Sequence, residues 1–113
     1  MNSNLEIIVH RANRAIDAFR QFMYALDYIT TVNDGKREYI FVGIASKDVD
    51  DLAEQYAKSI YKLVVDSLRN AGFSVEKDGD DYIVKDGDAK YRLRLSTMLL
   101  PGIALLEEGA SEA

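Results

Sequence analysis

The sequence of 113 residues contains no cysteine and no tryptophan, a single proline and a single histidine. Without cysteine, the chain has no disulfide, no thiolate nucleophile and no sulfur-ligated metal. The lone histidine, His10, has no companion for a paired-histidine metal site, and we interpret it as a solvated residue on the polar side of a helix. These absences exclude several classes of enzyme and metalloprotein.

Long apolar runs are also missing. A membrane span needs about 18 consecutive apolar residues, and no segment approaches that length. The first residues do not have the pattern of a secretory signal. The net charge is −5, which argues mildly against bulk attraction to nucleic acid or to anionic lipid. We therefore expect a soluble, cytoplasmic protein with no membrane partner.

Signatures of catalysis are absent as well. The sequence has no glycine-rich phosphate loop, nucleophile elbow or paired-histidine helix. An acidic cluster between Glu76 and Asp88 could supply oxygen ligands to a hard cation, but Tyr82 and Ile83 stand where the calcium-loop pattern requires Asp or Asn and then Gly. Asp and Gly are also the residues that tight turns select, as in the two Asp-Gly-Asp triplets at 78–80 and 86–88. We expect turns here, with no enzymatic activity, no cofactor and no metal.

The residues that are present indicate a globular body. Hydrophobic residues make up 48% of the chain and charged residues 29%, a composition that supports an ordinary core in a domain of this size. The sequence predicts one α+β domain over residues 1–108, followed by a flexible tail at 109–113.

Residues 2–26 have the pattern of a long amphipathic helix. Ser3 and Glu6 have the spacing of a capping box at its start. Ten apolar residues recur at helical spacing and form one stripe along it: Leu5, Ile8, Val9, Ala12, Ala15, Ile16, Phe19, Phe22, Met23 and Leu26. This stripe indicates a core face or a seam between helices.

Residues 46–72 contain the most self-consistent helix, with Ser46 as the N-cap and Gly72 as the residue that ends it. Its apolar face broadens in the second half through Tyr61, Val65 and Leu68. We interpret the broad face as packing on a sheet, with the extra ridge against the other helix or a partner chain.

Strand patterns lie between the helices and after them. Residues 28–32 and 37–45 predict a hairpin around the turn at 33–35, unless the first helix continues through Thr30 and leaves only the second strand. After the second helix, 82–85 and 90–96 are predicted strands, and in the latter apolar residues alternate with Arg92 and Arg94. The expected order is α-ββ-α-βββ with a short C-terminal tail, two long helices covering one face of a small antiparallel sheet.

One strand carries an aromatic and basic pattern. Tyr39 and Phe41 share one strand face, next to Lys36 and Arg37, which is the arrangement of a base-stacking platform. The stretch partly resembles the aromatic strand motif of RNA-recognition folds, although Glu38, Ile40 and Ile44 depart from that motif. Arg92 and Arg94 would extend this candidate nucleic-acid face if both strands present it on the same side of the sheet.

Our leading hypothesis is a non-enzymatic interaction module that self-associates, with a dimer favoured, and binds a protein partner. Its candidate interface is the apolar surplus of the second helix and the C-terminal segment: Tyr61, Val65, Leu68, Met98, Leu99, Leu100, Ile103, Leu105 and Leu106. The segment from 98 to 106 is too apolar to remain in water, so it folds back or docks on another molecule. The alternatives are single-stranded nucleic-acid binding through the aromatic and basic face, and mimicry of nucleic acid by the acidic C-terminal half.

Overall fold

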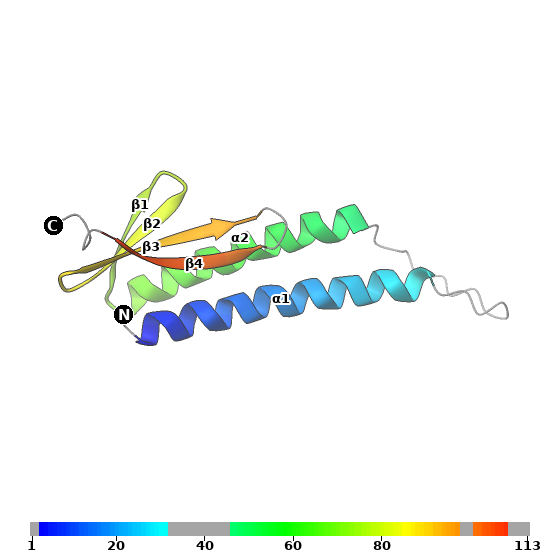
Figure 1. Cartoon of the computed structure of the whole chain (residues 1–113), viewed down its shortest axis with the longest axis horizontal. Helices are drawn as coiled ribbons and strands as arrows, with labels where there is room; N and C mark the ends of the chain where they lie inside the picture. Colours follow the sequence, from blue (N-terminus) through cyan, green and yellow to red (C-terminus); the bar gives the residue numbers. More distant parts are fainter. Residues whose placement is uncertain (1–2, 32–45, 98–100, 109–113) are drawn as a thin grey trace.

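A computed structural model describes residues 3–31, 46–97 and 101–108. In these residues two helices, α1 (Ser3–Thr31) and α2 (Ser46–Asn70), precede four strands. The strands are β1 (Ser74–Asp78), β2 (Asp81–Asp86), β3 (Ala89–Ser96) and β4 (Gly102–Glu108), and they form an antiparallel sheet in the order β1-β2-β3-β4. Both helices lie against one face of this sheet (Figure 1), which confirms the predicted fold class.

The first predicted strand is wrong, because α1 continues to Thr31 and includes residues 28–31. The alternative in which the helix continues is therefore correct. Aromatic and β-branched residues such as those at 28–31 cost at most about 0.7 kcal/mol each in a helix, so an established helix can extend through them. The second predicted strand, 37–45, lies outside the described residues.

The predicted end of α2 is confirmed. Gly72 has a φ of 98°, the left-handed conformation that closes a helix at little cost only for glycine. The Phe73 amide donates to the Leu68 carbonyl and the Gly72 amide to the Arg69 carbonyl, each at 3.0 Å. These two bonds form a Schellman motif and direct the chain straight into β1.

Both Asp-Gly-Asp triplets form tight turns, as predicted. Asp78 pairs with Asp81 across the first turn, and Asp86 pairs with Ala89 across the second. Each leaves a two-residue loop that begins with a glycine at positive φ, 62° and 61° respectively, as primed hairpin turns require. The two acidic turns close opposite ends of β2, and the predicted strands 82–85 and 90–96 are confirmed within β2 and β3.

The C-terminal apolar segment folds back onto the domain. Ile103 pairs with Leu95 of β3 and is buried, and β4 continues to Glu108 along that edge of the sheet. This is the first of the two outcomes expected for the segment. Residues 98–100 lie outside the described residues.

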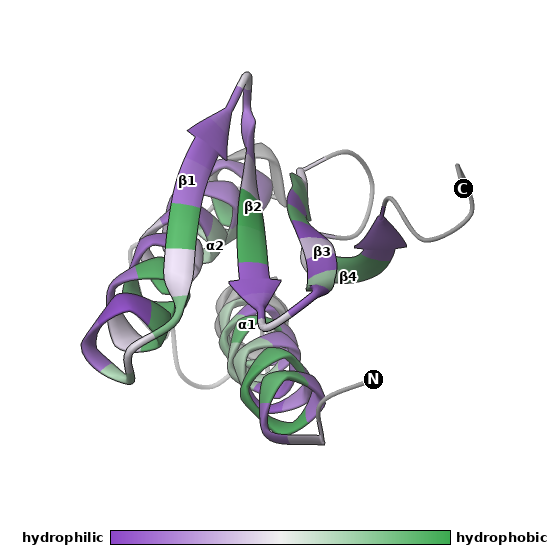
Figure 2. Cartoon of the chain, turned by 90° about the vertical axis from the view of Figure 1, so that its left-hand side faces the viewer, coloured by the Kyte–Doolittle hydropathy of each residue, from purple (hydrophilic) through white to green (hydrophobic). Residues whose placement is uncertain are grey.

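The core lies between the helices and the inner face of the sheet (Figure 2). Val84 and Leu93 in the central strands are completely buried, and Leu68 of α2 is only 1% exposed. The Tyr61 hydroxyl donates to the Leu93 carbonyl at 2.6 Å. Burial raises the pKa of Tyr61, so the hydroxyl keeps its proton and ties α2 to the middle of the sheet.

Each helix also contributes one side chain that covers an edge of the sheet. The Asn13 side chain of α1 donates to the Ile103 carbonyl at 2.9 Å and accepts from the Ile103 amide at 2.7 Å. It pairs with β4 as a neighbouring strand would. At the other edge, Arg69 of α2 donates to the Val75 carbonyl through Nε and Nη2, at 3.3 and 3.1 Å. These contacts occupy backbone groups that a further strand would otherwise pair with.

We expect Asn13→Ala to lower the free energy of unfolding by about 1–3 kcal/mol, because it leaves the amide and carbonyl of Ile103 without their side-chain partner in a half-buried site. Chemical denaturation measures the change. Asn13→Asp keeps the acceptor but loses the donor, and should also destabilise the fold. The neighbouring exposed substitution Arg14→Ala is the control, with a change within about 0.5 kcal/mol. Equal effects of Asn13→Ala and Arg14→Ala would contradict the role of Asn13.

Candidate functional site

The predicted nucleic-acid face is only partly described. Lys36, Arg37, Tyr39 and Phe41 lie outside the described residues. Arg92 and Arg94 project from the outer face of β3, opposite the helices, since they alternate with the buried Tyr91 and Leu93.

Three carboxylates surround the Arg92 guanidinium. Its Nη2 lies 2.7 Å from Asp78 Oδ2 and its Nη1 lies 2.9 Å from Asp81 Oδ2. On the other side, Nε and Nη2 donate to Glu108 at 2.9–3.0 Å. Arg94 also reaches Asp81, at 3.1 Å. The cluster links the β1–β2 turn to the end of β4 across the outer face.

The protonation states of this cluster are shifted toward the charged forms. Hydrogen bonds to Glu108, Asp78 and Asp81 raise the pKa of Arg92. The hydrogen bond from Arg94 is the largest cause that lowers the pKa of Asp81; burial opposes it, and the hydrogen bond from Arg92 lowers the pKa further. With a side chain only 19% exposed, Arg92 is engaged within the protein, and we assign it a structural role.

The outer face as a whole is balanced in charge. Strand alternation places four acidic and four basic residues there: Glu76, Asp78, Asp81 and Glu108 against Lys85, Lys90, Arg92 and Arg94. A balanced face has neither the positive potential that attracts a phosphate backbone nor the negative potential that imitates one.

We expect stability to depend on Asp81 at low pH. Because its folded pKa lies below the ordinary value of 3.8, its contribution is fully present above about pH 5 and is lost as pH falls through the folded pKa. Asp81→Asn should be less stable than the parent at neutral pH, and its stability should fall less between about pH 5 and pH 3. Denaturation midpoints across this range measure the difference. Parallel pH curves for the two proteins would show that the cluster contributes nothing through charge.

Of the predicted protein interface, most of the residues that the structure describes lie in the core. Tyr61, Val65 and Leu68 are buried between α2 and the sheet, and Ile103 is buried on β4. Leu105 packs partly against the same core, whereas Leu106 is 43% exposed on the outer face. Met98, Leu99 and Leu100 lie outside the described residues. The extra ridge of α2 therefore packs on the sheet within this chain, and a change such as Leu68→Glu would disrupt folding and could not test association.

A different apolar surface lies on the helices, on the side away from the sheet. Phe22 of α1 and Leu63 of α2 are each 59% exposed, and Leu52 is 37% exposed. Between them, the rings of Phe19 and Tyr56 stack across the two helices with centroids 4.2 Å apart. We call this surface the helix stripe, comprising Ile8, Ala15, Phe19 and Phe22 of α1 with Leu52, Tyr56, Ile60 and Leu63 of α2.

Helical spacing places the stripe beside the core, against which Ile8, Tyr56 and Ile60 also partly pack. Leu52, Tyr56, Ile60 and Leu63 follow one another at intervals of four, four and three residues, and so lie along one side of α2. The sheet-facing residues, such as Tyr61, lie on another side. The sequence already showed Phe22 and Leu63 as apolar residues on the broad apolar faces of the two helices. A face this broad does not show which of its residues meet the sheet and which stay exposed.

The charges that border the helix stripe differ between the two helices. Arg11 and Arg14 are exposed on α1, and Asp66 is exposed on α2. None of the three forms an ion pair with another residue in the described part of the chain. Beyond the end of the sheet, α1 and α2 continue side by side (Figure 1), so the pair presents an extended surface.

Comparison with known proteins gives no relative: no family model matches the sequence, and no curated protein or solved structure is significantly similar to it. Among the described residues, neither helix is long and apolar enough to cross a membrane.

Proposed function

We propose that this protein is a self-associating interaction module in which two copies pack their helix stripes together. The observation that carries the proposal is the exposure of Phe22 and Leu63, 59% each, on the helix stripe. Large apolar side chains that gather on one exposed side of a protein are typical of interaction sites. Covering the stripe would remove both side chains from water.

A second copy of the chain fits this surface for two reasons. A twofold contact places the same stripe on both sides of the interface, so one apolar surface is enough to make it complementary. If α1 of one copy lies over α2 of the other, Arg11 and Arg14 approach the Asp66 of the partner, and charges of opposite sign meet at the rim.

The other surfaces of the molecule are less suited to self-association. Asn13 and Arg69 cover backbone groups at the two edges of the sheet. The outer face is charged and is crossed by the Arg92 cluster. The two alternatives, nucleic-acid binding and nucleic-acid mimicry, gain no support from that face, because its charges are balanced.

We expect Phe22→Glu and Leu63→Glu, singly and together, to weaken dimerisation. Each change places a charge in the centre of an apolar interface, and a loss of at least about tenfold in affinity is typical for a central contact. Both residues are mostly exposed within one chain, so the fold should be retained. Sedimentation equilibrium measures the dissociation constant, and circular dichroism checks the fold.

Leu106→Glu is the matched control, because Leu106 is also apolar and exposed but lies on the outer face of the sheet. It should leave the dimer intact. A parent protein that remains monomeric at high concentration, or a dimer lost equally in all three variants, would contradict the proposal.

A further inference from the structure

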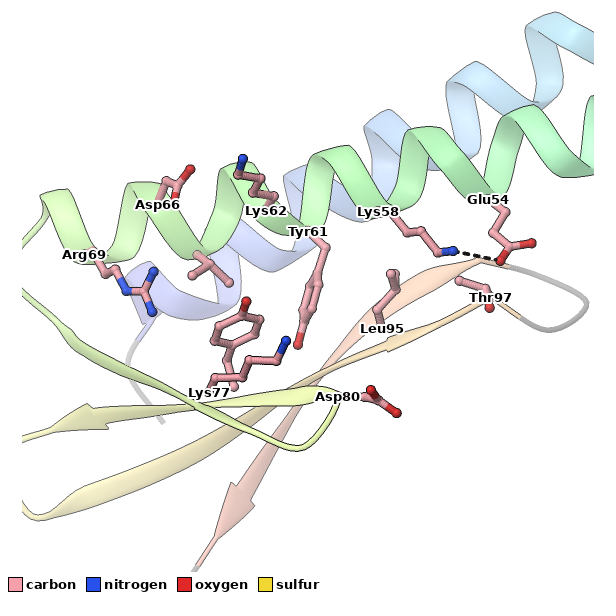
Figure 3. Close-up of a pocket in the computed structure, with 12 residues that line it drawn as sticks. Glu54, Lys58, Tyr61, Lys62, Asp66, Arg69, Lys77, Asp80, Leu95 and Thr97 are labelled. Carbon is pink, nitrogen blue, oxygen red and sulfur yellow. Dashed lines mark ion pairs between the residues drawn. The ribbon is translucent and has the colours of Figure 1, made fainter.

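A groove with a volume of about 560 Å³ lies between α2 and the β1–β2 hairpin. It is separate from the helix stripe, since it lies on the side of α2 that faces the sheet. Figure 3 shows Arg69 of α2 directed toward the hairpin, Lys77 on the hairpin directed toward α2, Asp80 at the hairpin turn, and Lys62 on α2 directed away from the hairpin, at the rim of the groove. Its volume is within the range of about 300–1,000 Å³ that small-ligand sites occupy.

The floor of the groove is aromatic and aliphatic. It is made by Tyr61, Val65, Tyr82 and Leu95. The ring of Tyr82 meets that of Tyr61 edge to face, with centroids 5.6 Å apart, and the Arg69 guanidinium lies 5.8 Å from the centre of the Tyr82 ring. Tyr82 and Leu95 are half-buried, so each presents part of its side chain to an entering group. A flat ring would find apolar contacts here.

The rim of the groove is basic on an otherwise acidic molecule. Four cationic and three anionic side chains line it, a net charge of +1, whereas the whole chain carries −5. Lys58 pairs with Glu54 at 3.3 Å, and Arg69 is engaged by the Val75 carbonyl. Lys62 and Lys77 pair with no residue in the described part of the chain. Two ammonium groups therefore remain to meet an anion, that of Lys77 inside the groove and that of Lys62 at its rim.

We infer that the groove binds a small organic phosphate that carries a planar ring, as a mononucleotide does. The ring packs on Tyr82 and Leu95, and the phosphate binds at Lys77, with Lys62 at the rim adding positive potential. Lysine binds phosphate as a point charge, and aromatic side chains stack on bases without sequence preference. The exposed Asp66 and Asp80 on the rim oppose an anion and limit its affinity. This inference does not rest on self-association.

The test is a titration of the full-length, isotope-labelled chain by NMR at constant ionic strength, with three probes. Adenosine 5′-monophosphate combines ring and phosphate, adenosine has the ring alone, and inorganic phosphate has the anion alone. We expect saturable shifts of amides in residues 58–69 and 77–82 with the monophosphate, and affinities at least about tenfold weaker for each of the other two probes.

Charge variants locate the site. Lys62→Glu with Lys77→Glu should weaken binding of the monophosphate at least about tenfold, whereas Lys85→Glu with Lys90→Glu makes the same charge change on the outer face and should leave it unchanged. Asp80→Asn should strengthen it. Tyr82→Leu keeps an apolar floor but removes the ring, and should reduce the monophosphate affinity toward that of inorganic phosphate.

Four outcomes would overturn the inference. They are the absence of saturable binding, shifts centred outside the groove, equal affinity for inorganic phosphate and the monophosphate, and equal losses in the two double lysine variants. The last two would show a general response to anions and no site for a ring-bearing phosphate.

Discussion

The contact between Asn13 and Ile103 joins the first helix to the last strand and fixes how the two layers of the fold meet. Its two hydrogen bonds, 2.9 and 2.7 Å long, connect positions 90 residues apart in the sequence. α1 packs mainly on α2 and also along β4, and this contact ties the helix to the edge of the sheet. An amide side chain suits the task because it carries one donor and one acceptor group, as a peptide unit does.

The position of α1 determines which surfaces remain exposed. With Asn13 directed at the β4 edge, Leu5 and Ile16 enter the core while Phe22 is left at the surface. On α2, the hydrogen bond from the Tyr61 hydroxyl to the Leu93 carbonyl directs the Tyr61 side of the helix to the sheet. Leu63 therefore stays on the exposed side of α2. The helix stripe is a consequence of these two attachments. The proposed interface and the groove at the hairpin lie on different sides of α2, and Asp66 stands at the rim of both.

Local signals predicted the fold well where they were unambiguous. The Gly72 helix end, both Asp-Gly-Asp turns and the alternation around Arg92 are set by neighbouring residues, and each is confirmed. The strand at 28–32 was wrongly predicted because the β propensity of a few residues has less effect than the extension of a long helix that has already formed. The return of the C-terminal segment as β4 depends on contacts distant in sequence, and the sequence alone left two outcomes open.

The candidate site was less predictable than the fold. Tyr61, Val65 and Leu68 have the same apolar character as Leu52 and Leu63, and only the direction of the sheet separates core from surface. The partners of Arg92 come from three separate segments, so their convergence could not be read from spacing. The groove likewise arises from the angle between α2 and the hairpin, which no local pattern encodes.

The central claim, that two copies meet through the helix stripe, can be tested directly by spin-label distances, because the chain has no cysteine of its own. A single label at Ser59→Cys, on an exposed position of α2 beside the stripe, should show strong dipolar coupling between copies. A label at Ala104→Cys, on the outer face of the sheet, should show weak coupling. Strong coupling at Ala104 with weak coupling at Ser59 would place the contact on the sheet and contradict the account, as would the absence of coupling at both positions.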